Sequence, residues 1–405
     1  MKRFTIMRGP DMDSIRNSAG NYRLALAFAC SVFLQAGSAL ASELTCADNF
    51  PAATKIVKLG MSTALSGPNQ YLGLSMSQGV RARIDEANCA AEWRRQGIQF
   101  ELIVLDDNYD PQIAARNTQT LIEDHKVVAI VGNVGTPTAE KSWQIANEKQ
   151  VVFYGAYTGA NLLRLNPPAP FVFNYRPSYD QEMEAVVADI VARGIPIKSI
   201  GLFLQNDSFG NAGLAALQKA LEKICGDCQQ DIFQMRYERN SLKTGAAVEE
   251  FIAAEVKPRA VILAGSLEPS AEFIRFAQRL SPVTRFYCLS FISPSALQKK
   301  LVVGRYQLTS SQVLPEQSAM TAGSTNATGE AYTNEVYREG YMETQLLLDA
   351  VAAIQGSVTG ETLRQSLARL ERQLPGNPGD QQMMNNVWLA QVYNHEQSGV
   401  AASVK

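Results

Sequence analysis

The fold is decided by residues 56–88, which read IVKLGMSTALSGPNQYLGLSMSQGVRARIDEAN. An apolar run at 56–61 leads into a loop rich in Gly and hydroxyl residues, and residues 76–88 then carry an apolar stripe at helical spacing. Short apolar runs of this kind indicate buried strands, and a 3.6-residue period indicates an amphipathic helix. The stretch therefore predicts one strand followed by one helix.

The same alternation continues along the chain. Further strands are expected at residues 100–105, 127–131, 151–154, 199–204, 260–264 and 285–289. Helices are expected at residues 111–124, 139–148, 181–193, 211–224, 246–255 and 270–280. Near the C-terminus, residues 337–354 and 361–370 have helical patterns and residues 387–393 have a strand pattern. Strands that alternate with helices are typical of α/β proteins with parallel sheets.

A proline cluster, Asn166-Pro167-Pro168-Ala169-Pro170, separates two successive series of such units. We therefore expect two doubly wound lobes rather than one continuous sheet. The late helices are expected to return to the first lobe. Residues 315–330, rich in Ser, Thr, Ala and Gly, are interpreted as a flexible surface connection.

The N-terminal segment has the features of a secretory signal. Arg23 precedes an apolar run at 24–34, and small residues follow at Ala39 and Ala41. The run is too short to cross a bilayer, so we expect cleavage after Ala41 and export to the periplasm without a membrane anchor; a buried helix is the alternative. Removal of residues 1–41 changes the net charge from −2 to −5, which argues against nucleic acid as a partner.

Five of the six cysteines follow this segment, where export favours disulfides. Cys46 and Cys89 flank the first strand and helix, so we predict that they pair. Cys225 and Cys228 form a CxxC sequence, which is either a local disulfide, the interpretation we favour, or a redox or metal motif. Cys288 lies in an apolar run and is expected to be a buried free thiol.

The sequence offers few parts for catalysis. Its two histidines, His125 and His395, are far apart in the chain, and no nucleophile elbow, phosphate-binding loop or dinucleotide fingerprint is present. Neither a metal nor a cofactor is expected. Asp106 and Asp107 follow the second predicted strand and are either a carboxylate pair or caps of the next helix.

Polar, glycine-rich loops follow three of the predicted strands, at residues 62–71, 132–138 and 155–159. In open α/β sheets, ligands bind beyond the carboxyl ends of the strands, where helix N-termini offer free N–H groups. We therefore predict a ligand site where these loops converge.

Several motifs in order resemble those of the periplasmic leucine/isoleucine/valine-binding protein family, the type I substrate-binding proteins of ABC transporters. The motifs are Leu65-Ser66-Gly67-Pro68 with Tyr71-Leu72-Gly73, Asp106-Asp107-Asn108-Tyr109-Asp110-Pro111, Ile130-Val131-Gly132, and residues 175–180 and 206–210. The resemblance implies two lobes joined by three hinge crossings, a ligand in the cleft, and delivery to a membrane permease. It places residues 54–173 and about 293–383 in the first lobe, and 174–292 and about 384–405 in the second.

The resemblance also suggests binding residues. Thr136 stands where a hydroxyl holds the ligand carboxylate, and Ala156, Tyr157 and Thr158 stand at a second carboxylate-binding turn. Tyr71 matches an aromatic residue of the cleft. The remaining candidates are Ser66, Phe209, Ser266, Glu268 and Phe291.

One departure concerns the ligand. Amino-acid binders of the family place a carboxylate near the loop after the strand that ends at Leu289, but this loop reads Ser290-Phe291-Ile292-Ser293. An unpaired buried ammonium would cost several kcal/mol. The ligand is therefore an amino acid only if Glu268 supplies the charge, whereas an amide, a urea-like solute or an aromatic carboxylate fits the loop as it stands. The bulk of Tyr157 suggests a small or flat ligand.

The expected function is a binding protein that closes its lobes on a ligand for an ABC-type permease. A periplasmic sensor subunit that reports to a membrane partner would have the same sequence features. A periplasmic enzyme that uses Asp106, Asp107 or the Cys225/Cys228 pair is the competing class.

Overall fold

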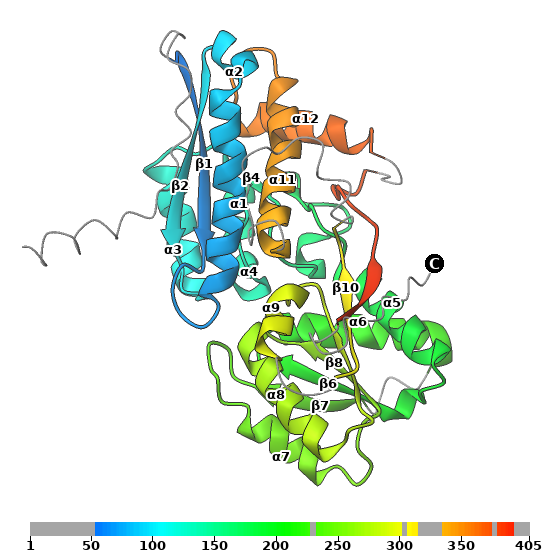
Figure 1. Cartoon of the computed structure of the whole chain (residues 1–405). Coiled ribbons are helices and arrows are strands. Elements are labelled where there is room, and N and C mark those ends of the chain that lie inside the picture. Colours follow the sequence, from blue (N-terminus) through cyan, green and yellow to red (C-terminus); the bar gives the residue numbers. More distant parts are fainter. Residues whose placement is uncertain (1–52, 227–231, 302–305, 315–333, 375–378, 393–405) are drawn as a thin grey trace, which may run out of the picture. The chain divides into compact units, whose positions relative to one another are not determined.

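The computed structural model describes residues 53–226, 232–301, 306–314, 334–374 and 379–392. The predicted signal segment and the predicted connection at 315–330 lie outside these residues, so both stay predictions. The described chain forms two sheets with helices packed against them (Figure 1).

The first sheet is parallel and has the strand order β2-β1-β3-β4-β5. Its strands are β1 (Lys55–Thr63), β2 (Ile98–Asp106), β3 (Ala129–Val131), β4 (Val152–Tyr154) and β5 (Val172–Phe173). The direction in which strands are added reverses at β1, because β2 lies on one side of it and β3 on the other. Such a switch point leaves a crevice at the carboxyl ends of the strands, where ligands bind in α/β folds.

Helices cover both faces of this sheet. They are α1 (Gln70–Cys89), α2 (Ala91–Arg95), α3 (Pro111–Glu123), α4 (Thr136–Glu148), η1 (Asn161–Leu163), α11 (Glu335–Ala352) and α12 (Gly360–Glu371). Successive strand residues point to opposite faces. Leu59 and Met61 therefore join a core cluster with residues of α1 and α11, which lie side by side, whereas Ile130 and Phe153 join a cluster with residues of α3 and α4 (Figure 1). We call this sheet and these helices the first lobe.

The second sheet has the order β11-β10-β9-β8-β6-β7 and is parallel except for β11. Its strands are β6 (Ile200–Gln205), β7 (Phe233–Tyr237), β8 (Ala260–Ala264), β9 (Arg285–Cys288), β10 (Leu308–Gln312) and β11 (Trp388–Val392). Its helices are α5 (Tyr179–Ala192), α6 (Ser208–Cys225), α7 (Gly245–Ala253), α8 (Leu267–Leu280) and α9 (Pro294–Lys300), with a short η2 (Ile197–Ser199). We call this sheet and these helices the second lobe.

The second lobe is also wound on both faces. Ile262 shares a core cluster with residues of α5 and α6, whereas its neighbours Val261 and Leu263 share one with residues of α7 and α8. The predicted fold class, two doubly wound α/β lobes, is confirmed. The chain passes between lobes after β5, after β10 and after α12.

The structure adds detail that the sequence patterns did not provide. The strands β5, β7 and β10 and the helices α2 and α9 were not predicted. The sequence assigned residues from about 293 to the first lobe, but β10 pairs with β9 and so lies in the second sheet. α11 and α12 pack against the first lobe, as expected.

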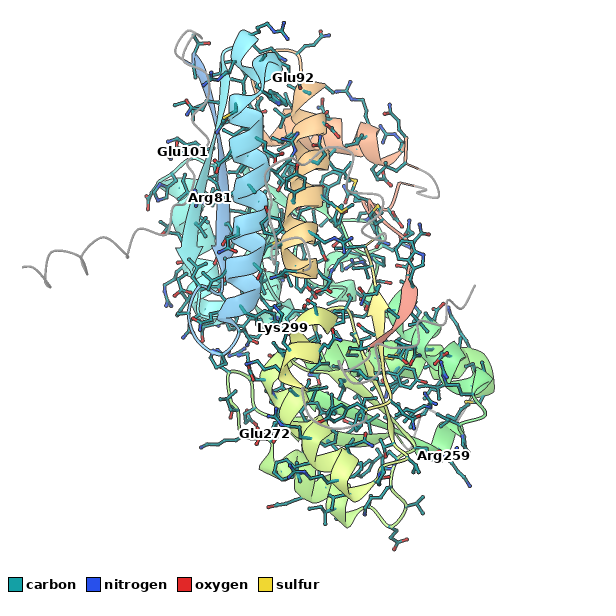
Figure 2. The ribbon with its side chains drawn as sticks, viewed as in Figure 1. Arg81, Glu92, Glu101, Arg259, Glu272 and Lys299 are labelled. Atoms are coloured by element: carbon teal, nitrogen blue, oxygen red, sulfur yellow. The ribbon has the colours of Figure 1, made fainter. Side chains whose placement is uncertain are left out.

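Many charged side chains lie on the surface. Those of Arg81, Glu92 and Glu101 in the first lobe and of Arg259 and Glu272 in the second project from the ribbon (Figure 2). None of the described helices is long and apolar enough to cross a membrane.

Two of the predicted disulfide cysteines lie in described elements. Cys89 and Cys225 are each disulfide-bonded, whereas Cys288 is a buried free thiol. The predicted partners Cys46 and Cys228 lie outside the described residues, so both pairings stay predictions.

Candidate functional site

The first lobe presents two buried threonine hydroxyls at the carboxyl ends of β3 and β4. Thr136 is the first residue of α4, and Thr158 lies in the turn after β4. Their Oγ1 atoms are 2.7 Å apart, and the Thr158 hydroxyl also accepts a hydrogen bond from the Ala160 N–H. Because a helix leaves its first N–H groups without internal acceptors, the start of α4 and the two hydroxyls together can hold a carboxylate.

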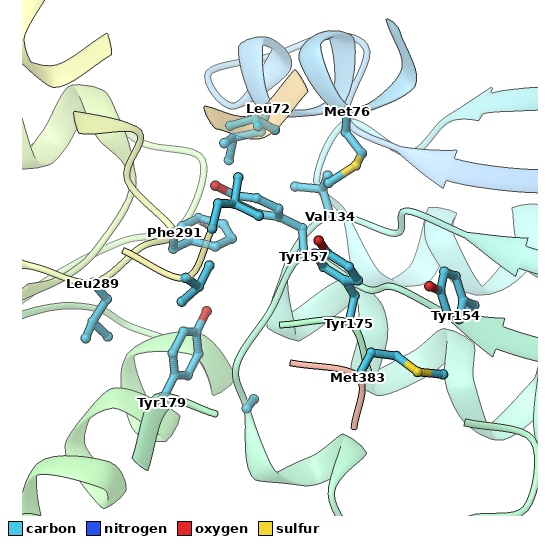
Figure 3. Packing of buried hydrophobic residues seen from close by; sticks show 14 of the residues in the cluster. Leu72, Met76, Val134, Tyr154, Tyr157, Tyr175, Tyr179, Leu289, Phe291 and Met383 are labelled. Atoms are coloured by element: carbon cyan, nitrogen blue, oxygen red, sulfur yellow. The ribbon is translucent and has the colours of Figure 1, made fainter. Parts of the chain in front are cut away.

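A group of aromatic rings from both lobes reaches this threonine pair through Tyr179, whose hydroxyl lies 3.4 Å from that of Thr158. We call them the ring cluster, which consists of Tyr109, Tyr157, Tyr179, Phe209 and Phe291. All of them are buried, with at most 1% of the residue exposed. Phe291 lies at the centre: its ring centroid is 4.5 Å from that of Phe209, 5.5 Å from that of Tyr157 and 6.4 Å from that of Tyr109. Figure 3 shows Phe291 and Tyr157 facing each other, with Tyr179 nearby.

Tyr157 connects the two lobes directly. Its hydroxyl donates a 3.0 Å hydrogen bond to the carbonyl oxygen of Ser290 in the second lobe. On the other side of the ring, the guanidinium carbon of Arg176 lies 3.9 Å from the ring centroid, a cation–π contact. The residue that the sequence associated with a flat ligand is thus held from both sides by the protein.

A buried ion pair supports Tyr157. Arg176, which is 1% exposed, donates two hydrogen bonds of 2.8 Å to the carboxylate of Glu339 on α11. Burial opposes the charge of Arg176, but Glu339, Tyr157 and Glu182 together outweigh burial, and the pKa of the guanidinium is raised. Arg176 therefore remains charged beneath the ring.

A second buried carboxyl of α11 has no such partner. Glu343 is fully buried near Gly132 and Gly155, and neither of its carboxyl oxygens has a hydrogen-bond partner among the described residues. A Cβ on Gly155 would lie 2.5 Å from Oε2 of Glu343, so the missing side chain makes room for the carboxyl group. Burial raises the pKa of Glu343 well above its ordinary value.

Tyr109 reaches the cleft through an unusual backbone. Asn108 and Tyr109 have φ angles of 49° and 56°, which non-glycine residues rarely adopt. The carboxylate of Asp107 accepts the Tyr109 N–H at 2.9 Å and so fixes the turn, and burial raises the pKa of that carboxyl to about 7. Gly135 makes room for the ring, since a Cβ there would lie 2.3 Å from it. Strain of this kind concentrates at ligand-binding sites.

An asparagine of the second lobe bridges to the same turn. Asn240, also with a positive φ of 55°, donates from its side-chain amide to the carbonyl oxygen of Asn108 at 3.0 Å. Its side-chain oxygen accepts a 3.2 Å hydrogen bond from the amide of Asn69, which precedes α1. We call this arrangement the asparagine bridge.

The loop after β9 obtains a carboxylate from another element. The sequence shows no acidic residue there, but Glu182 of α5 accepts hydrogen bonds from the Ser290 N–H at 2.7 Å and the Ser290 hydroxyl at 2.9 Å. The hydroxyl of Ser311 donates to it as well. Glu182 is fully buried and serves to hold the loop that carries Phe291.

Among the ten predicted site residues, Thr136, Tyr157, Thr158, Phe209 and Phe291 meet at the cleft. Ala156 directly precedes Tyr157 in the sequence and is buried in a core cluster of the first lobe. Sequence reasoning missed Tyr109, Tyr179, Arg176 and Glu182 as site residues. The DDNYDP turn was noticed, but nothing local indicates that its tyrosine enters the cleft.

The other four candidates have partners elsewhere. Ser66 donates its hydroxyl to Asp106 at 2.6 Å. Tyr71 packs against core clusters of both lobes. The Ser266 N–H donates to the Tyr237 hydroxyl at 2.7 Å, and Glu268 forms a 2.6 Å ion pair with Lys300. The described contacts do not join Ser66 or Glu268 to the ring cluster.

A cavity of about 460 Å³ adjoins the ring cluster and shares Tyr179 as a wall. The hydroxyl of Tyr179 lies 3.4 Å from that of Thr158, so this side chain links the threonine pair to the cavity. Its lining includes the small apolar residues Ala160, Ala212 and Ala215. Burial raises the pKa of Tyr179 to about 12, so its hydroxyl is neutral and able to donate at neutral pH.

Two α/β lobes, with polar groups of one and rings of both meeting at the strand ends, define a two-lobed ligand-binding fold. Residues 56–397 match the family model described as periplasmic binding protein. The comparison with curated proteins finds no match.

Solved structures agree. A possible leucine/isoleucine/valine-binding protein from Rhodopirellula baltica is 32% identical, with a TM-score of 0.75 over 86% of this chain and 97% of that one. A leucine-binding protein from Thermotoga maritima is 18% identical, with a TM-score of 0.67 over 84% and 96% of the two chains. A branched-chain amino acid transporter protein from Thermus thermophilus with bound valine is 18% identical, with a TM-score of 0.64 over 79% and 84%. The chain therefore belongs to the leucine/isoleucine/valine-binding family of type I periplasmic binding proteins.

Proposed function

We propose that this protein captures a small ligand between its lobes in the periplasm and presents the closed form to an ABC-type permease. The observation that carries the proposal is the ring cluster, because rings of two lobes pack against one another and Tyr179 of the second lobe reaches the hydroxyl pair of the first. A site assembled from both lobes changes when the lobes separate. Ligand occupancy can thereby be converted into a surface that a permease recognises.

The geometry favours binding over catalysis. Asp106 accepts hydrogen bonds from the N–H groups of Leu65, Ser66 and Asn108, so it fixes loops. Asp107 is engaged by the hydroxyl of Ser62 at 2.8 Å. Neither is a free general base within reach of the threonine pair, so we propose that the protein is not an enzyme.

Family membership supports the transport role, and the Thermus relative holds valine. For this chain an amino acid, an amide or urea-like solute and an aromatic carboxylate are the ligand classes to test. A sensor subunit would use the same closure to report to a different membrane partner. Export after cleavage behind Ala41 is part of the proposal.

The test uses purified residues 42–405, freed of bound ligand by unfolding and refolding. The midpoint of thermal unfolding is measured with and without compounds of these three classes. A ligand that binds only the native state raises the midpoint by mass action. A saturable rise without product formation supports the proposal, and turnover of any compound contradicts it. Stimulation of ATP hydrolysis by a reconstituted permease would then distinguish transport from sensing.

A further inference from the structure

Two carboxylates near the ring cluster are engaged within the protein, whereas the unpartnered Glu343 lies against Gly132 and Gly155 in the first lobe. Glu182 accepts hydrogen bonds from Ser290 and Ser311, and Asp207 accepts the Phe209 N–H at 2.9 Å and the Gln205 amide at 2.6 Å. The carboxylates around the adjoining cavity are engaged as well: Asp180 pairs with Lys219 at 2.5 Å, and Glu140 pairs with Lys141 at 3.0 Å. Each of these four carboxylates already has a polar or charged partner within the protein.

The engagement of these carboxylates makes an α-amino acid a less favourable ligand. An ammonium taken into a closed cleft loses its hydration, and without a carboxylate partner that loss is not compensated. An ammonium that took Glu182 as its partner would share a carboxylate that already accepts hydrogen bonds from Ser290 and Ser311 and holds the loop that carries Phe291. Among the described residues, neither Glu182 nor Asp207 is therefore a ready partner for the amine of an amino acid.

The other half of such a site is present. Thr136 and Thr158 provide two hydroxyls 2.7 Å apart at the start of α4, which suits a carboxylate. The rest of the wall is aromatic, and the cavity beyond Tyr179 is lined partly by alanines. Rings of this kind favour a flat or aliphatic body through stacking and burial.

We propose that the ligand is a monocarboxylate with an apolar or aromatic body and no ammonium group, an inference that rests on the proposed function. Its carboxylate lies at Thr136 and Thr158, and its body runs along Tyr179 toward the cavity. A ring next to the carboxylate would stack against the cluster, and an aliphatic chain would fill the same space.

The test uses two matched pairs that differ only in the ammonium: 3-phenylpropanoate against L-phenylalanine, and 4-methylpentanoate against L-leucine. Isothermal calorimetry on the stripped mature protein measures each dissociation constant at the same pH and salt. In each pair we expect the acid without the amine to bind at least about a hundredfold more tightly, which corresponds to about 3 kcal/mol.

The outcomes separate this inference from the proposed function. If an amino acid binds as tightly as its partner acid or more tightly, the ligand class is wrong and the proposed function stands. If only amides or ureas bind, the ligand class is again wrong and the proposed function again stands. If no compound of any class binds, both the ligand class and the proposed function fail.

A variant locates the carboxylate. Thr158→Val keeps the shape of the side chain and removes one hydroxyl, and we expect it to weaken 3-phenylpropanoate about tenfold or more. Thr118→Val is the matched control, because Thr118 is another buried threonine of the first lobe whose hydroxyl donates to the Ala114 carbonyl oxygen on α3. Equal loss in both variants would remove the threonine pair from the site.

Discussion

The two lobes present different chemistry to the cleft between them. At the edge of the first lobe, hydroxyls and helix N–H groups are ordered by bonds made within that lobe, as between Thr136 and Thr158. At the edge of the second, Phe209 and Phe291 contribute apolar rings and few free polar groups. The polar anchor can therefore exist in the first lobe alone, whereas the aromatic enclosure requires both lobes. We infer that a ligand meets the first lobe first and that the second lobe then excludes water.

The largest expected effect concerns the buried ion pair of Arg176 and Glu339, which supports Tyr157. Glu339→Gln leaves Arg176 as an unpaired buried charge beneath Tyr157, and we expect a loss of about 3 to 5 kcal/mol in the free energy of unfolding. Urea titration measures it. Glu361→Gln is the control, because Glu361 pairs with Arg364 on the surface of the same lobe and an exposed ion pair contributes little to stability. Similar losses in both variants would contradict the supporting role of the buried pair.

The second prediction removes the contribution of the second lobe. Phe291→Ala deletes ring contacts with Tyr109, Tyr157 and Phe209, and we expect 3-phenylpropanoate to bind about 2 to 3 kcal/mol more weakly. Phe273→Ala removes a ring of the same lobe that stacks on Phe203 in the other core cluster. Both variants should unfold more easily, but only Phe291→Ala should lose affinity in calorimetry. An affinity loss in the control as large as in Phe291→Ala would deny the enclosing role.

The third prediction removes the anchor of the first lobe. Thr136→Val leaves one polar partner of the carboxylate unmatched, which should cost about 1 to 3 kcal/mol of binding free energy. The stability of the unliganded protein should change less than the affinity. Comparison of the midpoint shift with and without 3-phenylpropanoate measures both, and unchanged affinity would exclude Thr136 from the site.

The smallest effect concerns contact between the lobes without ligand. Asn240→Asp keeps the side-chain shape but loses the donor of the asparagine bridge, and Asn240→Gly keeps the positive φ but loses the whole amide. We expect each to lower the population of the contacting form about tenfold, since one or two hydrogen bonds contribute about 1 kcal/mol.

Glu140 and Asn211, one from each lobe, line the same cavity and offer positions for a reporter. With cysteines at both, a short bismaleimide cross-links them only when the lobes meet, so the initial rate reports that population. Equal rates with and without the amide of Asn240 would show that the bridge contributes nothing to closure.

Much of the fold could be predicted because most strands are buried on both faces. β8 was predicted with its observed bounds, since all its residues are apolar and buried. β7 was missed because it alternates polar and apolar residues at the edge of the sheet, and β10 was missed because it reads LTSSQ. The hydroxyls of β10 are buried beside Glu182, which no local pattern reveals.

The site could be predicted only where it follows directly from a strand end. Thr136 and Thr158 lie in such turns, and the rule for α/β sheets finds them. Arg176 and Glu339 are 163 residues apart and become partners only through tertiary packing. Tyr109 enters the cleft because of a backbone conformation that its residue type disfavours, so a pattern of residue types cannot foresee it.

Glu343 couples the stability of the first lobe to pH. Its pKa in the folded chain lies above that of an unfolded glutamate, so between the two values the native state holds this proton more tightly than the unfolded chain does. The contribution of Glu343 to the free energy of unfolding is fully present below the pKa of the unfolded chain. It is lost progressively as pH rises toward the pKa of the folded chain. A protein with this group should become easier to unfold in alkaline surroundings even with its cleft empty, and Glu343→Gln should flatten that dependence in unfolding curves measured across pH. The pH of the surroundings thus changes the stability of the protein through Glu343, a buried residue of the first lobe.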